Sequence, residues 1–85
     1  MPGMLQPKRR LHYHTDTEMT YQIWPINGGL PTTRTLPITM KQWFSWQIGG
    51  QPIQDAMPHL SSDDREWLMT GLTQAQLEAF ILERD

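Results

Sequence analysis

Cysteine is absent from this chain of 85 residues. Its absence excludes disulfide bonds and metal sites built from thiolates. The chain also lacks an apolar run of about 18 residues, the minimum for a helix that crosses a membrane. The basic run Lys8–Arg10 is followed by polar residues rather than by the apolar segment of a secretory signal. We therefore expect a cytoplasmic protein without a membrane partner.

Motifs of catalysis are missing as well. The chain has no glycine-rich phosphate loop, no recognisable set of nucleophile, histidine and acid, and no cofactor fingerprint. We therefore predict that the protein is not an enzyme and takes no cofactor.

Charge is distributed unevenly along the chain, whose net charge is −2. Residues 1–41 carry five basic side chains against two acidic ones, whereas residues 42–85 carry two basic against seven acidic. Affinity for nucleic acid comes largely from Lys and Arg. The second half is therefore a poor candidate for binding phosphate groups.

Aromatic and sulfur-containing side chains supply much of the apolar content, with four Trp and six Met. A chain of this length buries only about 60–65% of its unfolded surface, so its core must be small. We expect Trp46 to be partly exposed, because it lies on a helix too short to bury every aromatic ring. The residues that we expect to pack together in the core are Trp43, Met57, Trp67, Leu68 and Phe80.

The first part of the chain favours β-structure. Residues 1–10 are rich in proline, glycine and charge, and we predict a flexible tail there. Residues 11–15 alternate apolar and polar side chains, as a strand does. Residues 19–26 and 32–38 are rich in β-favouring side chains and flank the turn signal Asn27-Gly28-Gly29. We predict a hairpin from these two segments, with the strand from Leu11 as a third member.

Helix start and stop signals recur from residue 39 onward. Thr39 suits the capping position of a first helix, which Gly49-Gly50 ends. Pro52 suits the first position of a short helix over residues 53–57, because its ring fixes φ near the helical value.

Residues 61–84 have the pattern of two further helices that meet at Gly71. Ser61 and Asp64 have the spacing of a capping box, and Thr73 and Gln76 repeat it. A glycine suits the corner between the helices because it adopts the left-handed conformation without strain.

The order of these elements predicts an α+β fold. We expect a small antiparallel β-hairpin or three-stranded sheet followed by three to four short helices. They form a single domain over residues 11–85, β-rich over residues 11–38 and helical over residues 39–85. Short hairpins and tryptophan-rich faces need covering in so small a chain, which makes a homodimer a candidate state.

Residues 53–71 carry a specific signature, IQDAMPHLSSDDREWLMTG. It resembles the pattern IQDAFPxLSxDDREFLMTG of a family of small proteins found in bacteriophages and other mobile elements, whose activity is not known. A looser match extends over residues 38–80, about half of the chain, but residues 73–77 depart from the Thr-Pro-Glu-Glu-Trp usual in the family. The resemblance implies an accessory protein of a phage or prophage in a bacterial cell, and it brings no catalytic residues.

Exposed aromatic and acidic side chains suggest a surface that binds a partner protein. Asp63, Asp64 and Glu66 lie at the start of a predicted helix, where the helix dipole favours negative charge. Capping and the dipole account for these carboxylates without catalysis. Together with Trp46, they are our candidates for contact with a host or phage protein, because exposed aromatic rings mark interfaces.

A basic and aromatic cluster provides an alternative site near the start of the chain. Lys8, Arg9, Arg10 and Tyr13 could hold single-stranded nucleic acid by charge and stacking. Short basic runs are common by chance, so binding of nucleic acid is the alternative rather than the first hypothesis.

A metal site is a third alternative. On a regular strand His12, His14 and Asp16 would point to the same face, and two imidazoles with one carboxylate suit zinc or iron. Leu11 and Tyr13 compete for the buried face, which favours a merely polar strand surface.

Our leading hypothesis is thus a non-enzymatic phage or prophage accessory protein that acts by protein–protein interaction. Host takeover and anti-defence are candidate roles that fit such a protein. A nucleic-acid-binding accessory protein is the alternative.

Overall fold

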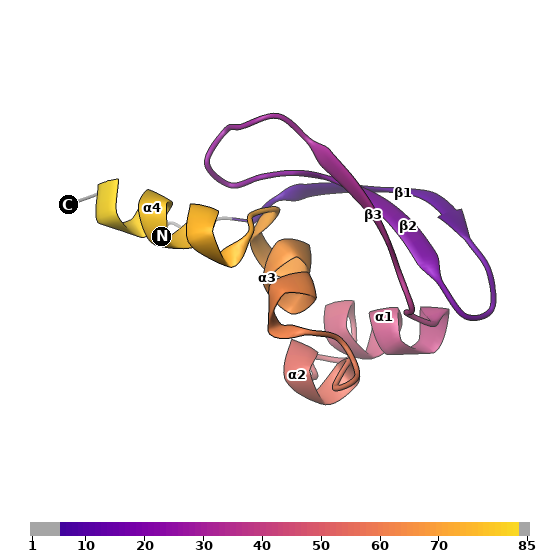
Figure 1. The fold of residues 1–85 in the computed structure, drawn as a ribbon. Coiled ribbons are helices and arrows are strands. Elements are labelled where there is room, and N and C mark those ends of the chain that lie inside the picture. The colour runs from indigo at the N-terminus through magenta and orange to yellow at the C-terminus, as the bar shows by residue number, and fades with distance from the viewer. Residues whose placement is uncertain (1–5, 84–85) are drawn as a thin grey trace.

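A three-stranded antiparallel sheet precedes four helices in the computed structural model, which describes residues 6–83 (Figure 1). The α+β prediction is confirmed, with the third strand present. No helix in the described residues is both long and apolar enough to cross a membrane. The elements in order are β1 (Lys8–His14), β2 (Met19–Trp24), β3 (Thr32–Leu36), α1 (Met40–Gln47), α2 (Ile53–Ala56), α3 (Ser62–Thr70) and α4 (Gln74–Glu83).

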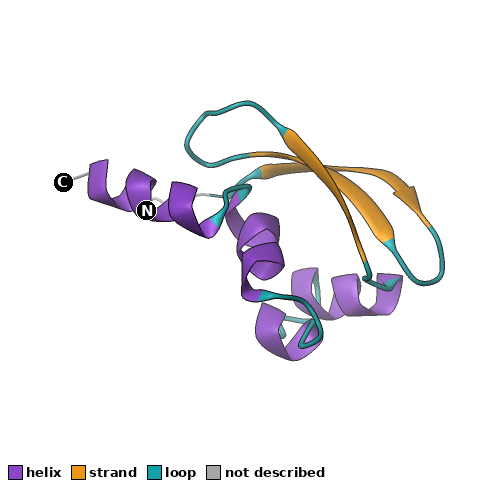
Figure 2. Ribbon diagram, in the orientation of Figure 1, coloured by secondary structure: helices purple, strands orange, loops and turns teal. Residues whose placement is uncertain are grey.

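The sheet has one buried face. In the central strand β2, Met19, Tyr21 and Ile23 are buried, while the residues between them are partly exposed. This alternation follows from the two-residue period of a strand. Helices α1, α2 and α3 lie on one side of the sheet, and α4 extends away from them (Figure 2).

The core lies between the buried face of β2 and the helices. Leu36 and Ile38 continue it from the end of β3, and Trp67 and Leu68 of α3 close it from the helical side. The predicted core residues Met57, Trp67 and Leu68 are buried, whereas Trp43 is partly buried and packs against the cluster.

Two predictions about the chain ends need correction. Strand β1 begins at Lys8, within the predicted tail, because Arg9 pairs with Ile23 in the ladder and its Nε donates to the carbonyl oxygen of Leu68 at 2.8 Å. Residues 1–5 of that tail lie outside the described residues. Phe80 is not in the buried core cluster, because α4 leads away from the sheet and from the other helices.

Three of the helices have a side-chain cap at their N-terminus, and two of these caps are complete capping boxes. Thr39 and Gln42 form a complete capping box at α1. Thr73 and Gln76 exchange the same pair of hydrogen bonds at α4, as predicted. At α3 the Ser61 hydroxyl accepts from the Asp64 amide at 3.1 Å, but the Asp64 carboxylate bonds elsewhere, so the box predicted there is only half formed.

The corner between α3 and α4 depends on Gly71. Its φ is 77°, and its N–H donates to the carbonyl oxygen of Trp67. A Cβ at this position would lie 2.6 Å from Cα of Pro25 and 2.9 Å from a methyl carbon of Ile23. The glycine therefore allows both the left-handed backbone and the close approach of the sheet to the end of α3.

We expect Gly71→Ala to lower the free energy of unfolding by at least about 2 kcal/mol, because left-handed strain and a backbone clash add. Gly50→Ala is the matched control, since Gly50 has a φ of 75° but nothing within 4 Å of its missing Cβ. It should cost only about 1 kcal/mol. Urea unfolding of the two variants measures the difference, and equal losses would contradict the close contact with Pro25.

Candidate binding surfaces

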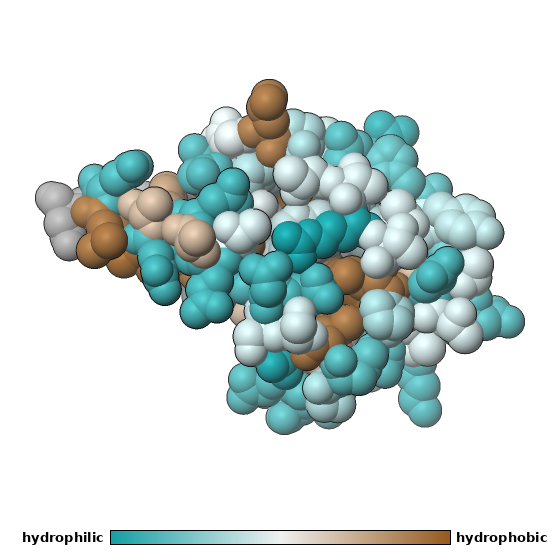
Figure 3. Space-filling model, in the orientation of Figure 1, coloured by the Kyte–Doolittle hydropathy of each residue, from teal (hydrophilic) through white to brown (hydrophobic). Residues whose placement is uncertain are grey.

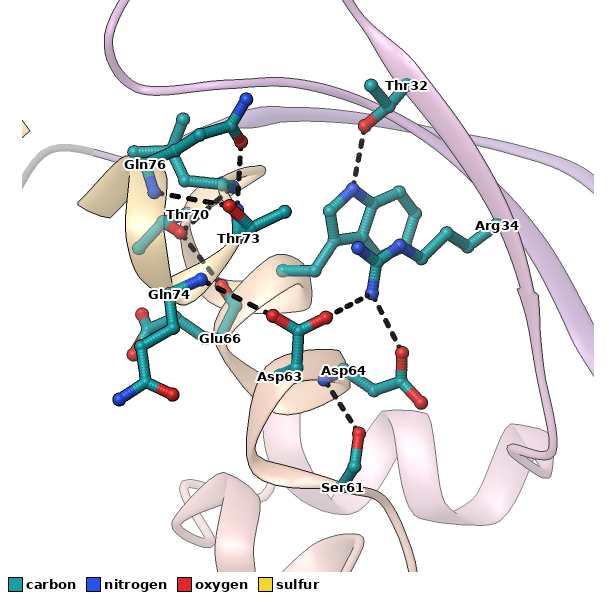
Figure 4. Close-up of polar contacts among 12 residues, drawn as sticks. Thr32, Arg34, Ser61, Asp63, Asp64, Glu66, Thr70, Thr73, Gln74 and Gln76 are labelled. Carbon is teal, nitrogen blue, oxygen red and sulfur yellow. Dashed lines mark hydrogen bonds and ion pairs between the residues drawn. The ribbon is translucent and has the colours of Figure 1, made fainter. Parts of the chain in front are cut away.

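Arg34 of β3 contacts both acidic residues at the start of α3 (Figure 4). Its Nη1 donates to Asp63 Oδ2 at 3.1 Å and to Asp64 Oδ1 at 2.9 Å. The guanidinium also lies over the ring of the buried Trp67, 5.1 Å from its centroid. These contacts join the sheet to the helical layer.

The same cluster extends to α4 and to the start of β3. The second oxygen of Asp63 accepts from the backbone N–H of Gln74 at 3.3 Å. The indole N–H of Trp67 donates to the Thr32 hydroxyl at 2.7 Å. Asp63 thus contacts two other elements at once, and Asp63 and Asp64 have a structural role.

Sequence reasoning proposed these two carboxylates for partner binding and missed Arg34. A signal was present, because Arg34 shares one face of its strand with Thr32 and Leu36 and so faces the helices. A cation on the buried face of a strand needs a partner of opposite charge. The adjacent carboxylates of Asp63 and Asp64 were a candidate partner.

We expect Arg34→Met to lower the free energy of unfolding by about 1 kcal/mol, since the pair is only partly buried. In a double-mutant cycle, Asp64→Asn should cost less in the Arg34→Met background than alone. Lys41→Met removes an exposed cation from α1 and should be nearly neutral. Additive losses for Arg34 and Asp64 in urea unfolding would argue against the pair.

A hollow of about 500 Å³ lies between the start of β1, the end of α1 and α3. It brings together Trp46 and Glu66, two of the four residues predicted to bind a partner, and it adds Arg9. Trp46 is partly exposed, as predicted. The residues that line this Trp46 hollow are Gln6, Arg9, Trp46, Gln47, Glu66, Met69 and Thr70.

Stacked side chains hold the wall of the Trp46 hollow in place. Tyr21 stacks on Trp43 with ring centroids 4.2 Å apart, and Trp43 meets Trp46 edge to face at 5.2 Å. The Arg9 guanidinium lies 5.0 Å from the centroid of the Trp46 ring. Burial lowers the pKa of Arg9 from its ordinary value, while the negative charge of an ionised Tyr21 would raise it.

Burial also raises the pKa of Tyr21 to about 12, against an ordinary value of 10.0, and the charge of Arg9 opposes this rise. An unfolded chain loses the phenolic proton first. The stability due to the neutral phenol is therefore complete below about pH 10 and is lost as the pH rises toward about 12. We expect urea unfolding to show this fall in the free energy of unfolding. The fall should be smaller in Tyr21→Phe, which has no phenolic proton to lose. An identical pH dependence in both proteins would contradict the assignment.

The other face of the sheet carries most of the basic and aromatic cluster. By the register of β1 and β2, Lys8 opposes Trp24 and Arg10 opposes Gln22, on the face away from the helices. Tyr13 opposes Thr20 on the same face. Arg9 opposes the buried Ile23, so it points toward the helices and separates from the other predicted nucleic-acid-binding residues.

The strand pairing contradicts the alternative of a metal site at His12, His14 and Asp16. The ladder between β1 and β2 shifts register between Leu11 and Tyr13, so His12 is the extra residue of a bulge. His12 reaches Gln22 on the outer face, at 2.8 Å, whereas His14 opposes the buried Met19. In residues 6–83 no three histidine, cysteine, aspartate or glutamate residues gather to hold an ion.

No protein-family model, curated protein or solved structure matches the chain.

Proposed function

We propose that the protein is a non-enzymatic accessory protein that binds another protein at the Trp46 hollow. The observation that supports this most is the meeting of Trp46, Arg9 and Glu66 at one concave site. Tryptophan and arginine are the side chains most enriched among residues that dominate binding energy at interfaces.

The hollow offers charged groups of both signs, and neither Arg9 nor Glu66 makes an ion pair within residues 6–83. Arg9 uses Nε for the carbonyl oxygen of Leu68, and no other hydrogen bond or ion pair within the described residues engages its guanidinium. The Glu66 carboxylate likewise has no such partner there, although the Glu66 carbonyl accepts from Thr70. With the apolar Met69 beside them, these groups suit a partner segment that carries an apolar side chain between an acidic and a basic one.

Pre-organisation favours this site over the acidic pair. Trp46 is held by Trp43 on one side and by Arg9 on another, so little side-chain freedom remains to be lost on binding. Asp63 and Asp64 would first have to give up Arg34.

The resemblance of residues 53–71 supports a phage or prophage origin and action in the cytoplasm of a bacterial host. Host takeover or anti-defence is the role that we propose on that basis. The partner is then a host or phage protein, and a second copy of the chain is the remaining candidate. Sedimentation of the purified protein over a range of concentrations tests for self-association and so distinguishes a second copy of the chain from a different partner.

We expect Trp46→Ala to abolish capture of a partner from bacterial lysate, because it removes the aromatic anchor. Phe44→Ala is the matched control, since Phe44 is a 49% exposed aromatic side chain on the same helix. Circular dichroism and thermal unfolding should first show that both variants fold. A partner retained by Trp46→Ala, or lost equally with Phe44→Ala, would contradict the proposal.

A further inference from the structure

We propose that the outer face of the sheet, opposite the helices, binds single-stranded nucleic acid. This surface is separate from the Trp46 hollow and does not depend on the function proposed for it. The residues that define this surface are Lys8, Arg10, Tyr13, Gln22 and Trp24.

The charge of this face is positive only. Lys8 and Arg10 stand two positions apart in β1 and both point outward, about 6.6 Å from each other along the strand. Neither makes an ion pair within residues 6–83. No residue of β1, β2 or β3 is acidic, and the nearest acidic side chains in sequence, Asp16 and Glu18, lie in the turn beyond β1. Lys8 and Arg10 can therefore attract phosphate groups, and no carboxylate of the strands repels them.

Aromatic rings stand at the two ends of the same face. Trp24 lies beneath the Lys8 ammonium, 4.9 Å from its ring centroid, and Tyr13 is 60% exposed. Because Tyr13 opposes Thr20, four residues before Trp24, the backbone positions of the two residues are about 13 Å apart along the strand direction. Unpaired bases stack on such rings, whatever their sequence.

Hydrogen-bonding side chains fill the space between the rings. Gln22 lies in the centre, paired with His12, and the Thr20 and Thr35 hydroxyls bond to each other at 2.7 Å. The part of the sheet that Figure 3 shows is mostly hydrophilic or neutral, apart from one apolar group that projects at the top of the view. A polar sheet with aromatic rings at its ends suits a splayed single strand, whose bases stack on the rings and bond to the polar side chains between them.

The number of cations on this face determines how strongly the binding constant should depend on salt concentration. Two phosphate contacts on a single strand give a slope of about −1.4 in log K against log salt concentration. Binding should therefore be weak, tolerant of sequence and measurable at low salt.

Fluorescence anisotropy with labelled single-stranded DNA and RNA of mixed sequence tests the proposal on the full chain. We expect Trp24→Ala and Arg10→Gln each to weaken binding by at least about fivefold, since stacking and charge both contribute. Arg10→Gln should also reduce the slope to about −0.7. Lys41→Gln, which removes an exposed cation from α1, is the matched control and should leave binding unchanged.

Three results would overturn the proposal: no binding of either oligonucleotide at the lowest salt, an equal loss with Lys41→Gln and Arg10→Gln, or binding of duplex DNA as tight as that of the single strand. Arg10 is exposed, so Arg10→Gln keeps the test valid if Trp24→Ala disturbs the fold. A preference for RNA over DNA, or the reverse, identifies which of the two the face binds.

Discussion

The contact of Arg34 with Trp67 and with the first turn of α3 is the constraint on which the rest of the structure depends. Trp67 is 1% exposed and fills the space between sheet and helices, and Arg34 lies over its ring while holding Asp63 and Asp64. A cation facing the helices would be costly without these carboxylates. The contact therefore orients the start of α3, whose Trp67 is buried in the core, and Gly71 allows the end of that helix to approach Pro25.

The contact of Arg34 with Asp63 and Asp64 also determines which charged groups of the surface remain available to partners. Because Arg34 holds the acidic pair, the conspicuous carboxylates of the signature are not free, and the groups left for partners lie elsewhere. Glu66, one turn further along α3, joins Trp46 and Arg9 at the hollow. The alternation of β1 places Arg9 there and leaves Lys8 and Arg10 on the outer face. One strand thus contributes to two separate binding surfaces.

Local signals allowed much of the fold to be predicted from sequence. The caps at Thr39 and Thr73 and the turn after Gly71 depend on neighbouring residues only, so each could be read from the chain. Contacts between distant segments were missed. The half-formed box at Ser61 needed knowledge of Arg34, 27 residues earlier. The alternative metal site assumed a regular strand, and the bulge at His12 depends on pairing with β2.

The arrangement of Arg34 over Trp67 is most directly tested by nuclear Overhauser effects in the full chain. We predict cross-peaks between the Arg34 side-chain protons and the Trp67 ring, together with slow solvent exchange of the indole N–H that donates to Thr32. Absence of those cross-peaks, with an indole proton that exchanges as fast as an exposed one, would contradict a structural role for Asp63 and Asp64.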